Sequence, residues 1–288
     1  MRFFLMIVAL LPLLSACGNP VSEPNPTQPA GTHSHGGGHH GAITSLGTVQ
    51  IAGNGFAVAR HGVCEPGKEA AFVMTPLEAA EHPPISLWIE DPDGKQISAG
   101  ATNEHTGGDL HFHARPKGNP ARLAIQSEGE TDVSYLDLRS KGAPTHDGIA
   151  APLVNSKGDL EGWIELKLHD DKGDLELWIS TDGEMKTPLD LPIASTLSIL
   201  FQSHDKKLVQ LRPRNTDQNE DEGGTANNRG GQTNYFIFPG DTGTDAKWLM
   251  GHSFRGIVSV AFERGGKPLQ TDLFVLTPHT HGAQGHQH

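Results

Sequence analysis

The stretch Ile85-Ser86-Leu87-Trp88-Ile89, followed by Asp91-Pro92-Asp93-Gly94-Lys95, decides the fold. Apolar residues alternate along its first part, and a period of two is typical of a strand with one buried face. The second part predicts a turn, because Pro and Asp favour the bend and Gly accepts a positive φ. A similar unit returns later, where Leu177-Trp178-Ile179 precedes Asp182-Gly183. The repetition predicts an all-β chain, and it is consistent with a tandem repeat of one unit.

Short apolar stretches of this kind recur before and after these two units in the sequence. In the first half we expect further strands at residues 49–51, 56–59, 69–74, 109–114, 122–126 and 133–138. In the second half we expect them at 162–168, 175–180, 196–202, 208–212, 234–238, 256–262 and 271–276. Residues 170–174 predict a hairpin turn, and only residues 76–81 suit a helical turn. Many short strands separated by turns predict two tandem antiparallel Ig-like β-sandwich domains, at 43–140 and 146–278.

The composition agrees with an all-β fold and argues against a protein that binds nucleic acid. The 288 residues give room for about two domains. The chain has 35 glycines, 20 prolines and 6% aromatic residues, which favours turns and short strands over long helices. Its 22 basic and 34 acidic residues give a net charge of −12. We therefore expect no nucleic acid partner, since no basic surface is available to displace counterions.

The start of the chain predicts a lipid anchor. Met1-Arg2 is basic and residues 3–14 are apolar, as in a secretion signal that is too short to span a bilayer. The signal ends in Leu14-Ser15-Ala16-Cys17, which resembles a bacterial lipobox. The resemblance implies a signal peptide at 1–16, acylation of Cys17 and anchoring in the membrane; the alternative is an ordinary signal with an incidental cysteine. Gly18 in place of Asp favours the outer membrane, facing the periplasm or the surface.

Histidines gather at both ends of the mature chain. Residues 17–42 read as a disordered Pro-, Gly- and His-rich tether, and residues 279–288 read as a His-rich tail. Together they hold eight of the 17 histidines: His33, His35, His39, His40, His279, His281, His286 and His288. Imidazoles on such segments can bind Zn²⁺, Cu²⁺ or Ni²⁺, and binding should fade as the pH falls through about 6.5. The alternative is a solvated linker and tail with biased composition.

An ordered metal site is predicted near the middle of the first half. His111 and His113 share one face of an expected strand, with Phe112 on the other face. His105, Glu104 or Asp109 could complete the site. The alternative is that both histidines occupy the solvent face of an amphipathic strand. His82 precedes Pro83-Pro84 in a loop, and we expect it to be exposed. His146, His169, His204 and His252 are isolated in the sequence, and we expect each of them to be structural.

The remaining candidates give little chemistry. Cys64 is the only cysteine besides Cys17, so it is buried and inert, or bridges two molecules, or binds a soft metal. Residues 214–232 predict a long solvated loop; its Asp217-x-Asn219-x-Asp221 start resembles a Ca²⁺ loop, but the glycine comes late and no Glu closes it. Residues 251–255 lack the second glycine of a nucleophile elbow. We expect no enzyme.

The body also resembles a known group of proteins. His146-Asp147-Gly148, residues 166–170, residues 175–179 and Gly251-x-x-Phe254-Arg255-Gly256 resemble His-Gly-initiated β-sandwich segments of extracytoplasmic proteins in planctomycete-like bacteria. In the first half, His40-Gly41 and residues 111–118 match them. Some of these segments are attached to adaptor subunits of heavy-metal efflux pumps, and this chain departs from them at Asp147 and lacks the adaptors' long helices. The resemblance implies a β-sandwich fold and heavy-metal efflux components as partners.

Two functions follow from these observations. The first is a lipid-anchored protein of the cell envelope that binds Zn²⁺, Cu²⁺ or Ni²⁺ through its histidines and buffers or delivers the ion, with Zn²⁺ or Cu²⁺ as the favoured cofactor. The second is a non-catalytic structural or protein-interaction module of the envelope.

Overall fold

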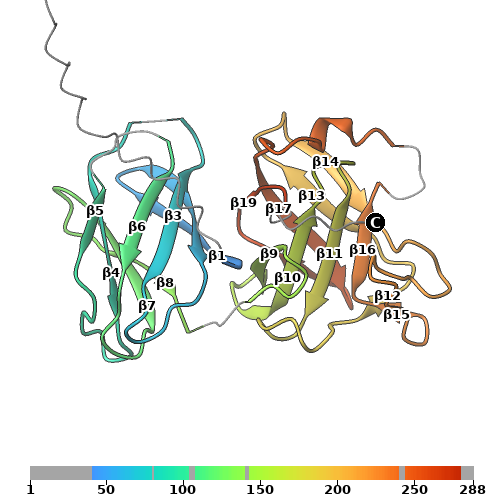
Figure 1. The fold of residues 1–288 in the computed structure, drawn as a ribbon, viewed down its shortest axis with the longest axis horizontal. Helices are drawn as coiled ribbons and strands as arrows, with labels where there is room; N and C mark the ends of the chain where they lie inside the picture. The colour runs from blue at the N-terminus through green and yellow to red at the C-terminus, as the bar shows by residue number, and fades with distance from the viewer. Residues whose placement is uncertain (1–40, 80, 104–107, 140–142, 240–243, 280–288) are drawn as a thin grey trace, which may run out of the picture. The chain divides into compact units, whose positions relative to one another are not determined.

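The computed structural model describes residues 41–79, 81–103, 108–139, 143–239 and 244–279, and their regular secondary structure is almost entirely β-strand (Figure 1). The first group of strands is β1 (Ile43–Ile51), β2 (Asn54–His61), β3 (Ala70–Pro76), β4 (Ile85–Glu90), β5 (Ala101–Asn103), β6 (Leu110–Ala114), β7 (Arg122–Ser127) and β8 (Ser134–Asp137). The second group is β9 (Ile149–Asn155), β10 (Leu160–Leu168), β11 (Leu175–Ser180), β12 (Leu191–Pro192), β13 (Leu197–Phe201), β14 (Lys207–Leu211), β15 (Gln232–Thr233), β16 (Tyr235–Phe238), β17 (Gly256–Arg264), β18 (Lys267–Gln270) and β19 (Phe274–Leu276).

Helical structure is confined to the short 3₁₀ turn η2 (Lys247–Leu249) within the ranges that the structure describes. The helical turn expected at residues 76–81 is wrong over its described part, because β3 ends at Pro76 and residues 77 and 78 form bends. Among the described residues, no helix combines the length and the apolar character needed to cross a membrane. The all-β prediction is confirmed.

The strands of the first group pack in two layers around one apolar cluster. β5, β4, β7 and β8 form one antiparallel sheet, in that order, and β1, β2, β3 and β6 follow one another in a larger sheet. Ile85, Leu87 and Ile89 of β4 are fully buried, and their side chains join a cluster with Phe56 of β2 and Phe72 of β3. The alternation expected for this strand is observed, since Ser86 and Trp88 are only half-buried.

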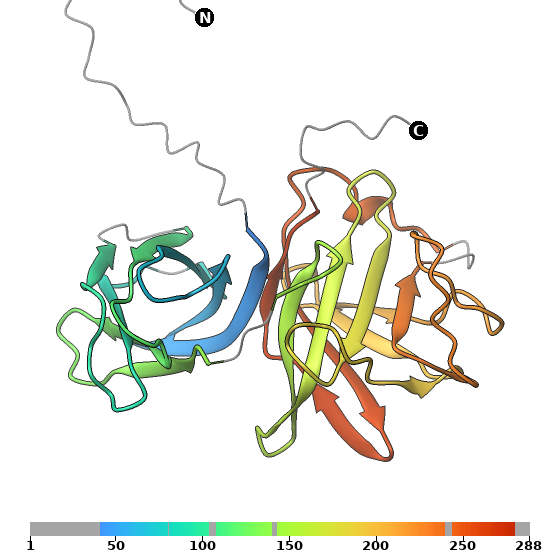
Figure 2. The same cartoon turned by 60° about the horizontal axis from the view of Figure 1, so that its bottom comes forward.

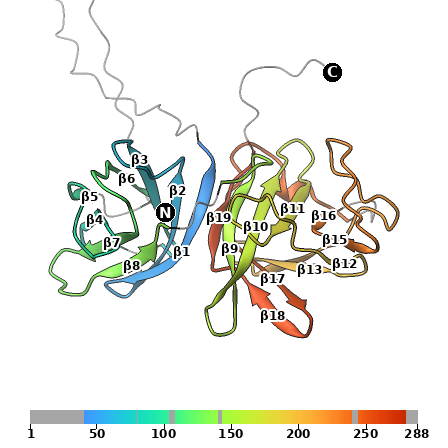
Figure 3. The same cartoon turned by 90° about the horizontal axis from the view of Figure 1, so that it is seen from below.

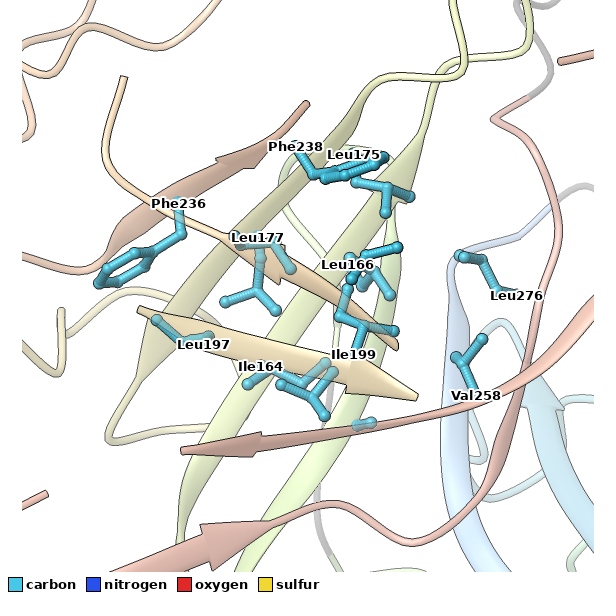
Figure 4. Close-up of a cluster of buried hydrophobic side chains, with 14 of the residues drawn as sticks. Ile164, Leu166, Leu175, Leu177, Leu197, Ile199, Phe236, Phe238, Val258 and Leu276 are labelled. Carbon is cyan, nitrogen blue, oxygen red and sulfur yellow. The ribbon is translucent and has the colours of Figure 1, made fainter. Parts of the chain in front are cut away.

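The strands of the second group surround a larger apolar cluster. β9, β10, β11 and β16 lie side by side in antiparallel pairs, as Figures 2 and 3 show. β14, β13, β17 and β18 pair in that order. Figure 4 shows side chains of β10 and β11 in one cluster with Leu197 and Ile199 of β13 and Val258 of β17. Burial of these apolar side chains is the main source of stability for this half.

A parallel pairing joins the two groups of strands. Ile43 and Thr44 of β1 lie opposite Ile149 and Ala150 of β9. β9 is therefore an inner strand, with β10 on its other side. Its Pro152 lies opposite Trp163 of β10, between the residues of β9 that pair with β1 and those that pair with β18. A proline is tolerated in a strand where its missing N–H is not needed by a neighbouring strand.

Candidate metal centre

The hairpin of β10 and β11 brings polar side chains to one end of the second group of strands. The main chain turns at residues 169–174, where His169 N–H donates to Asp174 O and Gly173 N–H donates to His169 O, both at 2.9 Å. Gly173 has a φ of 73°, a conformation that favours glycine. The hairpin turn predicted at residues 170–174 is confirmed, and it places His169 diagonally across from Glu176.

Alternation along the two strands divides their side chains between two faces. Leu166, Leu168, Leu175 and Leu177 point into the apolar cluster. His169 and Glu176 lie on the opposite face, since successive residues of a strand point to opposite sides. Every residue of β11 is nevertheless buried, so this outer face is also covered.

Three side chains converge on this outer face. His169 Nε2 lies 2.9 Å from Glu176 Oε2 and 3.5 Å from Glu222 Oε2. His169 is 5% exposed and Glu176 is 3% exposed, whereas Glu222 reaches in from an exposed loop. Within the described part of the chain, these residues form the one group of three His, Cys, Asp or Glu whose ligand atoms all lie within 4.8 Å of one another.

The loop between β14 and β15 supplies Glu222. Its Asn219 is fully buried, with a φ of 50°. The Asn219 amide donates to Thr233 Oγ1 at 2.7 Å and to Tyr235 O at 2.9 Å, and its Oδ1 accepts from Arg214 N–H at 2.7 Å. The expectation of a solvated loop is therefore wrong in part: Asn219 fastens the loop to β15 and β16, three residues before Glu222.

The electrostatics of the centre favour an ionised Glu176. Burial raises the pKa of this carboxyl, but hydrogen bonds with His169 and Tyr235 outweigh burial, and the pKa lies below its ordinary value. The Tyr235 hydroxyl donates to Glu176 Oε1, and burial together with the charge of Glu176 raises the pKa of Tyr235. Arg214 Nη2 donates to the Tyr235 oxygen at 3.3 Å. The centre thus presents a carboxylate, a neutral phenol and an imidazole.

The predicted pair His111 and His113 lies on β6 with both side chains exposed, while Phe112 is buried on the other face. The predicted geometry of one shared face is confirmed. His113 Nδ1 lies 3.2 Å from Glu69 Oε1. Asp109, one of the candidates for a third ligand, accepts a hydrogen bond from Arg255 Nη2 at 2.6 Å. Metal binding by this pair stays a prediction.

Most of the histidines predicted to bind metal lie outside the described residues. These are His33, His35, His39, His40, His105, His281, His286 and His288, and the lipidation site Cys17 lies outside them too. His279 is the last described residue of the tail. Its N–H donates to Leu168 O at 2.9 Å, so the tail begins beside the residue that precedes His169.

Cys64 is half-buried in a loop after β2. Burial raises the pKa of its thiol to about 11, against a smaller lowering by Arg60. A thiol needs its thiolate form to bind a metal or attack a disulfide. The electrostatics therefore favour the inert alternative among those open for this residue.

Other histidines that were expected to be structural differ from His169. The His146 ring stacks on Trp178 at 4.0 Å and its Nδ1 lies 2.9 Å from Glu165 Oε2. His204 stacks on Phe254 at 5.0 Å. These contacts suit packing roles. The expectation that His82 is exposed is wrong, because His82 is buried and its ring packs edge-on against Phe56. His169 differs from them because it meets two carboxylates, Glu176 and Glu222. The sequence analysis missed this group: alternation across the predicted hairpin was a signal that could have placed His169 and Glu176 on one face, but nothing local indicated Glu222.

Comparison with known proteins assigns no family. No protein-family model matches the chain, and no curated protein is similar to it in sequence. The chemistry of the centre therefore carries the functional argument.

Proposed function

We propose that this chain is a lipid-anchored, non-enzymatic protein of the cell envelope that binds a divalent transition metal ion and buffers or delivers it. The observation that carries the proposal is the convergence of His169, Glu176 and Glu222. The histidine-rich segments at the two ends of the mature chain support it as additional capture sites. The resemblance of Leu14-Ser15-Ala16-Cys17 to a lipobox supports a lipid anchor, and Gly18 supports the outer membrane as its location.

The spacing of the three ligand atoms suits an ion between them. Ligands at about 2.1 Å from Zn²⁺ stand about 3.0 Å apart at right angles and about 3.4 Å apart at the tetrahedral angle. The observed separations from His169 Nε2, 2.9 and 3.5 Å, lie close to this range. One imidazole and two carboxylates suit a borderline ion such as Zn²⁺, whereas Cu⁺ prefers sulfur. Three protein ligands leave at least one position open.

The scaffold proposed for this centre is a tandem pair of Ig-like β-sandwich domains. The two separate apolar clusters support it, because each draws on one half of the chain. The register of β1 and β9 supports the repeat. The motifs His40-Gly41-Ala42-Ile43 and His146-Asp147-Gly148-Ile149 were matched in the sequence, and Ile43 lies directly opposite Ile149.

Calorimetric titration with Zn²⁺ tests the metal proposal. The full chain without its leader and Cys17 should bind Zn²⁺ with micromolar or tighter affinity. Glu222→Gln should weaken the tightest class of site at least tenfold, because an amide is a poor ligand in place of a carboxylate. Glu220→Gln is the matched control, since Glu220 is an exposed carboxylate of the same loop. Equal binding by the chain and both variants, or no binding below millimolar Zn²⁺, contradicts the proposal.

A further inference from the structure

The outer face of the sheet formed by β5, β4, β7 and β8 carries two aromatic side chains in one row. Alternate residues of these strands enter the apolar cluster of the first group, so Trp88, Ala124 and Tyr135 lie on the opposite face. The register sets Trp88 opposite Ala124, and Ala124 opposite Tyr135. Two strand spacings place the aromatic residues about 10 Å apart. We call these three residues the aromatic row.

The aromatic row differs from other aromatic residues of the chain in its exposure. Of the Phe, Trp and Tyr residues that the structure describes, Trp88, Tyr135 and Trp248 are the ones that are not buried. Tyr135 is 48% exposed, and Trp88 is half-buried. Two of these residues therefore share one row of one sheet, and they leave aromatic surface in contact with water.

Charged neighbours hold both aromatic rings in place. Trp88 Nε1 donates to Glu90 Oε1 at 2.8 Å, and Arg122 Nε donates to Glu90 Oε2 at 2.6 Å. The Arg122 guanidinium lies over the Tyr135 ring, 4.4 Å from its centre. Side chains that are already ordered lose little conformational entropy when a ligand packs on them, which favours binding.

A polar pocket of about 610 Å³ adjoins the aromatic row. Ser86 of β4 and Gln126 of β7 line the pocket, and each lies two residues from a member of the row on the same face of the sheet. Thr102 of β5 lines it beside Ser86, and their hydroxyl oxygens are 3.1 Å apart. The pocket and the aromatic row therefore form one continuous surface.

The turn after β7 completes the pocket and sets its charge. Glu128 N–H donates to Pro84 O at 2.8 Å, and Gln126 Nε2 donates to Glu130 O at 2.9 Å, so the turn is fixed against the sheet. Glu128 and Glu130 are exposed, and no Lys or Arg is among the described residues that line the pocket. The two carboxylates disfavour an anionic ligand by repulsion.

Carbohydrate is the class of ligand that matches both parts of this surface. One face of a sugar ring presents C–H groups, which pack well on the electron-rich face of an aromatic ring. Sugar hydroxyl groups donate and accept hydrogen bonds, and the hydroxyl, amide and carboxylate groups of the pocket are suitable partners. A chain of several sugars is long enough to contact the pocket and the aromatic row together.

We infer that this face of the first group of strands binds an uncharged oligosaccharide, with one sugar ring packed on the aromatic row and the hydroxyl groups of a neighbouring sugar held in the polar pocket. The site shares no residue with the proposed metal centre. The inference is therefore independent of the proposed function and adds a second binding activity to it.

Glycan binding by the chain without its leader and Cys17 tests the inference. An array of neutral oligosaccharides identifies a ligand, and calorimetry then measures its affinity. We expect binding in the millimolar range or tighter. EDTA and Glu222→Gln should leave the affinity unchanged, because no metal ion takes part. An oligosaccharide that contains uronate should bind more weakly than the neutral ligand, because of the carboxylates of Glu128 and Glu130.

Two variants test the two parts of the surface. Tyr135→Leu keeps an apolar side chain on β8 but removes the ring, and it should weaken binding about tenfold. Thr102→Val removes a hydroxyl of the pocket with little change in shape, and it should weaken binding about threefold. Leu208→Ala is the control and should leave the affinity unchanged, since Leu208 is an exposed apolar residue of β14 in the second group.

Several results would overturn the inference. These are the absence of binding to every neutral oligosaccharide, or equal affinity in Tyr135→Leu and the unchanged protein. Binding that EDTA abolishes would place the sugar at a metal ion instead of at this face. Binding of cationic peptides without binding of neutral oligosaccharides would identify a protein partner for the two carboxylates.

Discussion

Two buried glutamates on neighbouring strands of the second group have different partners and different consequences. Glu165 is fully buried, and its carboxylate accepts hydrogen bonds from the N–H groups of Thr145, His146 and Gly148 at 2.7 to 2.9 Å. Glu176 has a histidine and a tyrosine as partners. Because its donors are backbone N–H groups, Glu165 holds the segment that leads into β9 in place. Side-chain partners can move aside, which leaves Glu176 available to an ion.

Glu165→Gln should destabilise the protein at neutral pH by about 1–3 kcal/mol, because the amide would turn a donor towards backbone N–H groups. Burial raises the pKa of Glu165, but the hydrogen bonds with His146, Gly148 and Thr145 lower it below its ordinary value. A carboxyl whose pKa is lower in the folded state stabilises the folded protein at any pH above its unfolded pKa of about 4.3. This stabilisation is lost as the pH falls through the folded-state pKa. The difference in free energy of unfolding between the unchanged protein and Glu165→Gln should therefore shrink in acid.

Urea unfolding at pH 7, 5 and 3.5 measures this effect. Glu263→Gln is the control, since Glu263 is an exposed glutamate of β17. If the two variants lose the same stability, or if the stability lost in Glu165→Gln does not depend on pH, this would falsify the role of Glu165 in holding the segment before β9.

At the scale of elements, β4 and β11 share a sequence pattern but differ in how deeply their outer faces are buried. Both strands contain the sequence Leu-Trp-Ile, and in both the alternate apolar residues enter a core. Trp88 of β4 is half-buried, whereas Trp178 of β11 is 5% exposed. The difference comes from remote segments, because His146 stacks on Trp178 and Tyr235 lies 5.2 Å from it. Covering the outer face of β11 also removes water from His169 and Glu176.

The turn between β10 and β11 is an element that should not tolerate a side chain. A Cβ at Gly173 would collide with the backbone oxygen of Ala246, and the positive φ adds strain. Gly158, between β9 and β10, has a φ of 84° and open space around its missing Cβ. Gly158→Ala should cost about 1–2 kcal/mol from backbone strain alone. Gly173→Ala should cost about 1–3 kcal/mol more, because of the collision, and should also weaken Zn²⁺ binding.

Chemical unfolding and Zn²⁺ titration of the two alanine variants test this prediction. Gly158→Ala serves as the control for strain without collision. Similar stability and similar Zn²⁺ affinity in both variants would show that the turn does not position His169.

At the scale of the whole molecule, ion binding should be linked to folding. The three ligands come from β11, from the residue that follows β10 and from the loop before β16, so they converge only in the folded chain. An ion that binds only the folded state stabilises it by about 2.7 kcal/mol at a concentration of about 100 times its Kd. For a protein of this size, that corresponds to a rise in Tm of roughly 5–10 °C.

Differential scanning calorimetry with Zn²⁺ checks the linkage. The rise in Tm should disappear in Glu222→Gln, and Mg²⁺ should produce little of it, because Mg²⁺ requires octahedral oxygen ligands and dehydrates reluctantly. An equal rise in Glu222→Gln would place the stabilising ion elsewhere.

Periodicity predicted most strands because one buried face imposes a repeat of two on the sequence. The strand expected at residues 175–180 is β11, and that expected at 85–89 is β4 with one more residue. β9 was missed, since Pro152 interrupts an otherwise apolar stretch. Its place in the sheet depends on β1, β10 and β18, which are distant partners that a local pattern cannot report.

The sequence by itself determined the all-β class, the turn at residues 170–174 and the shared face of His111 with His113. These properties follow from local backbone geometry, because alternation and turn chemistry need only neighbouring residues. Only the tertiary structure decided that the outer face of β11 is covered, that Glu222 meets His169 and that the tail starts beside Leu168. Glu222 and His169 are 53 positions apart and His279 and Leu168 are 111 apart, and such pairs are selected by packing of the whole chain and leave no signal in a local pattern.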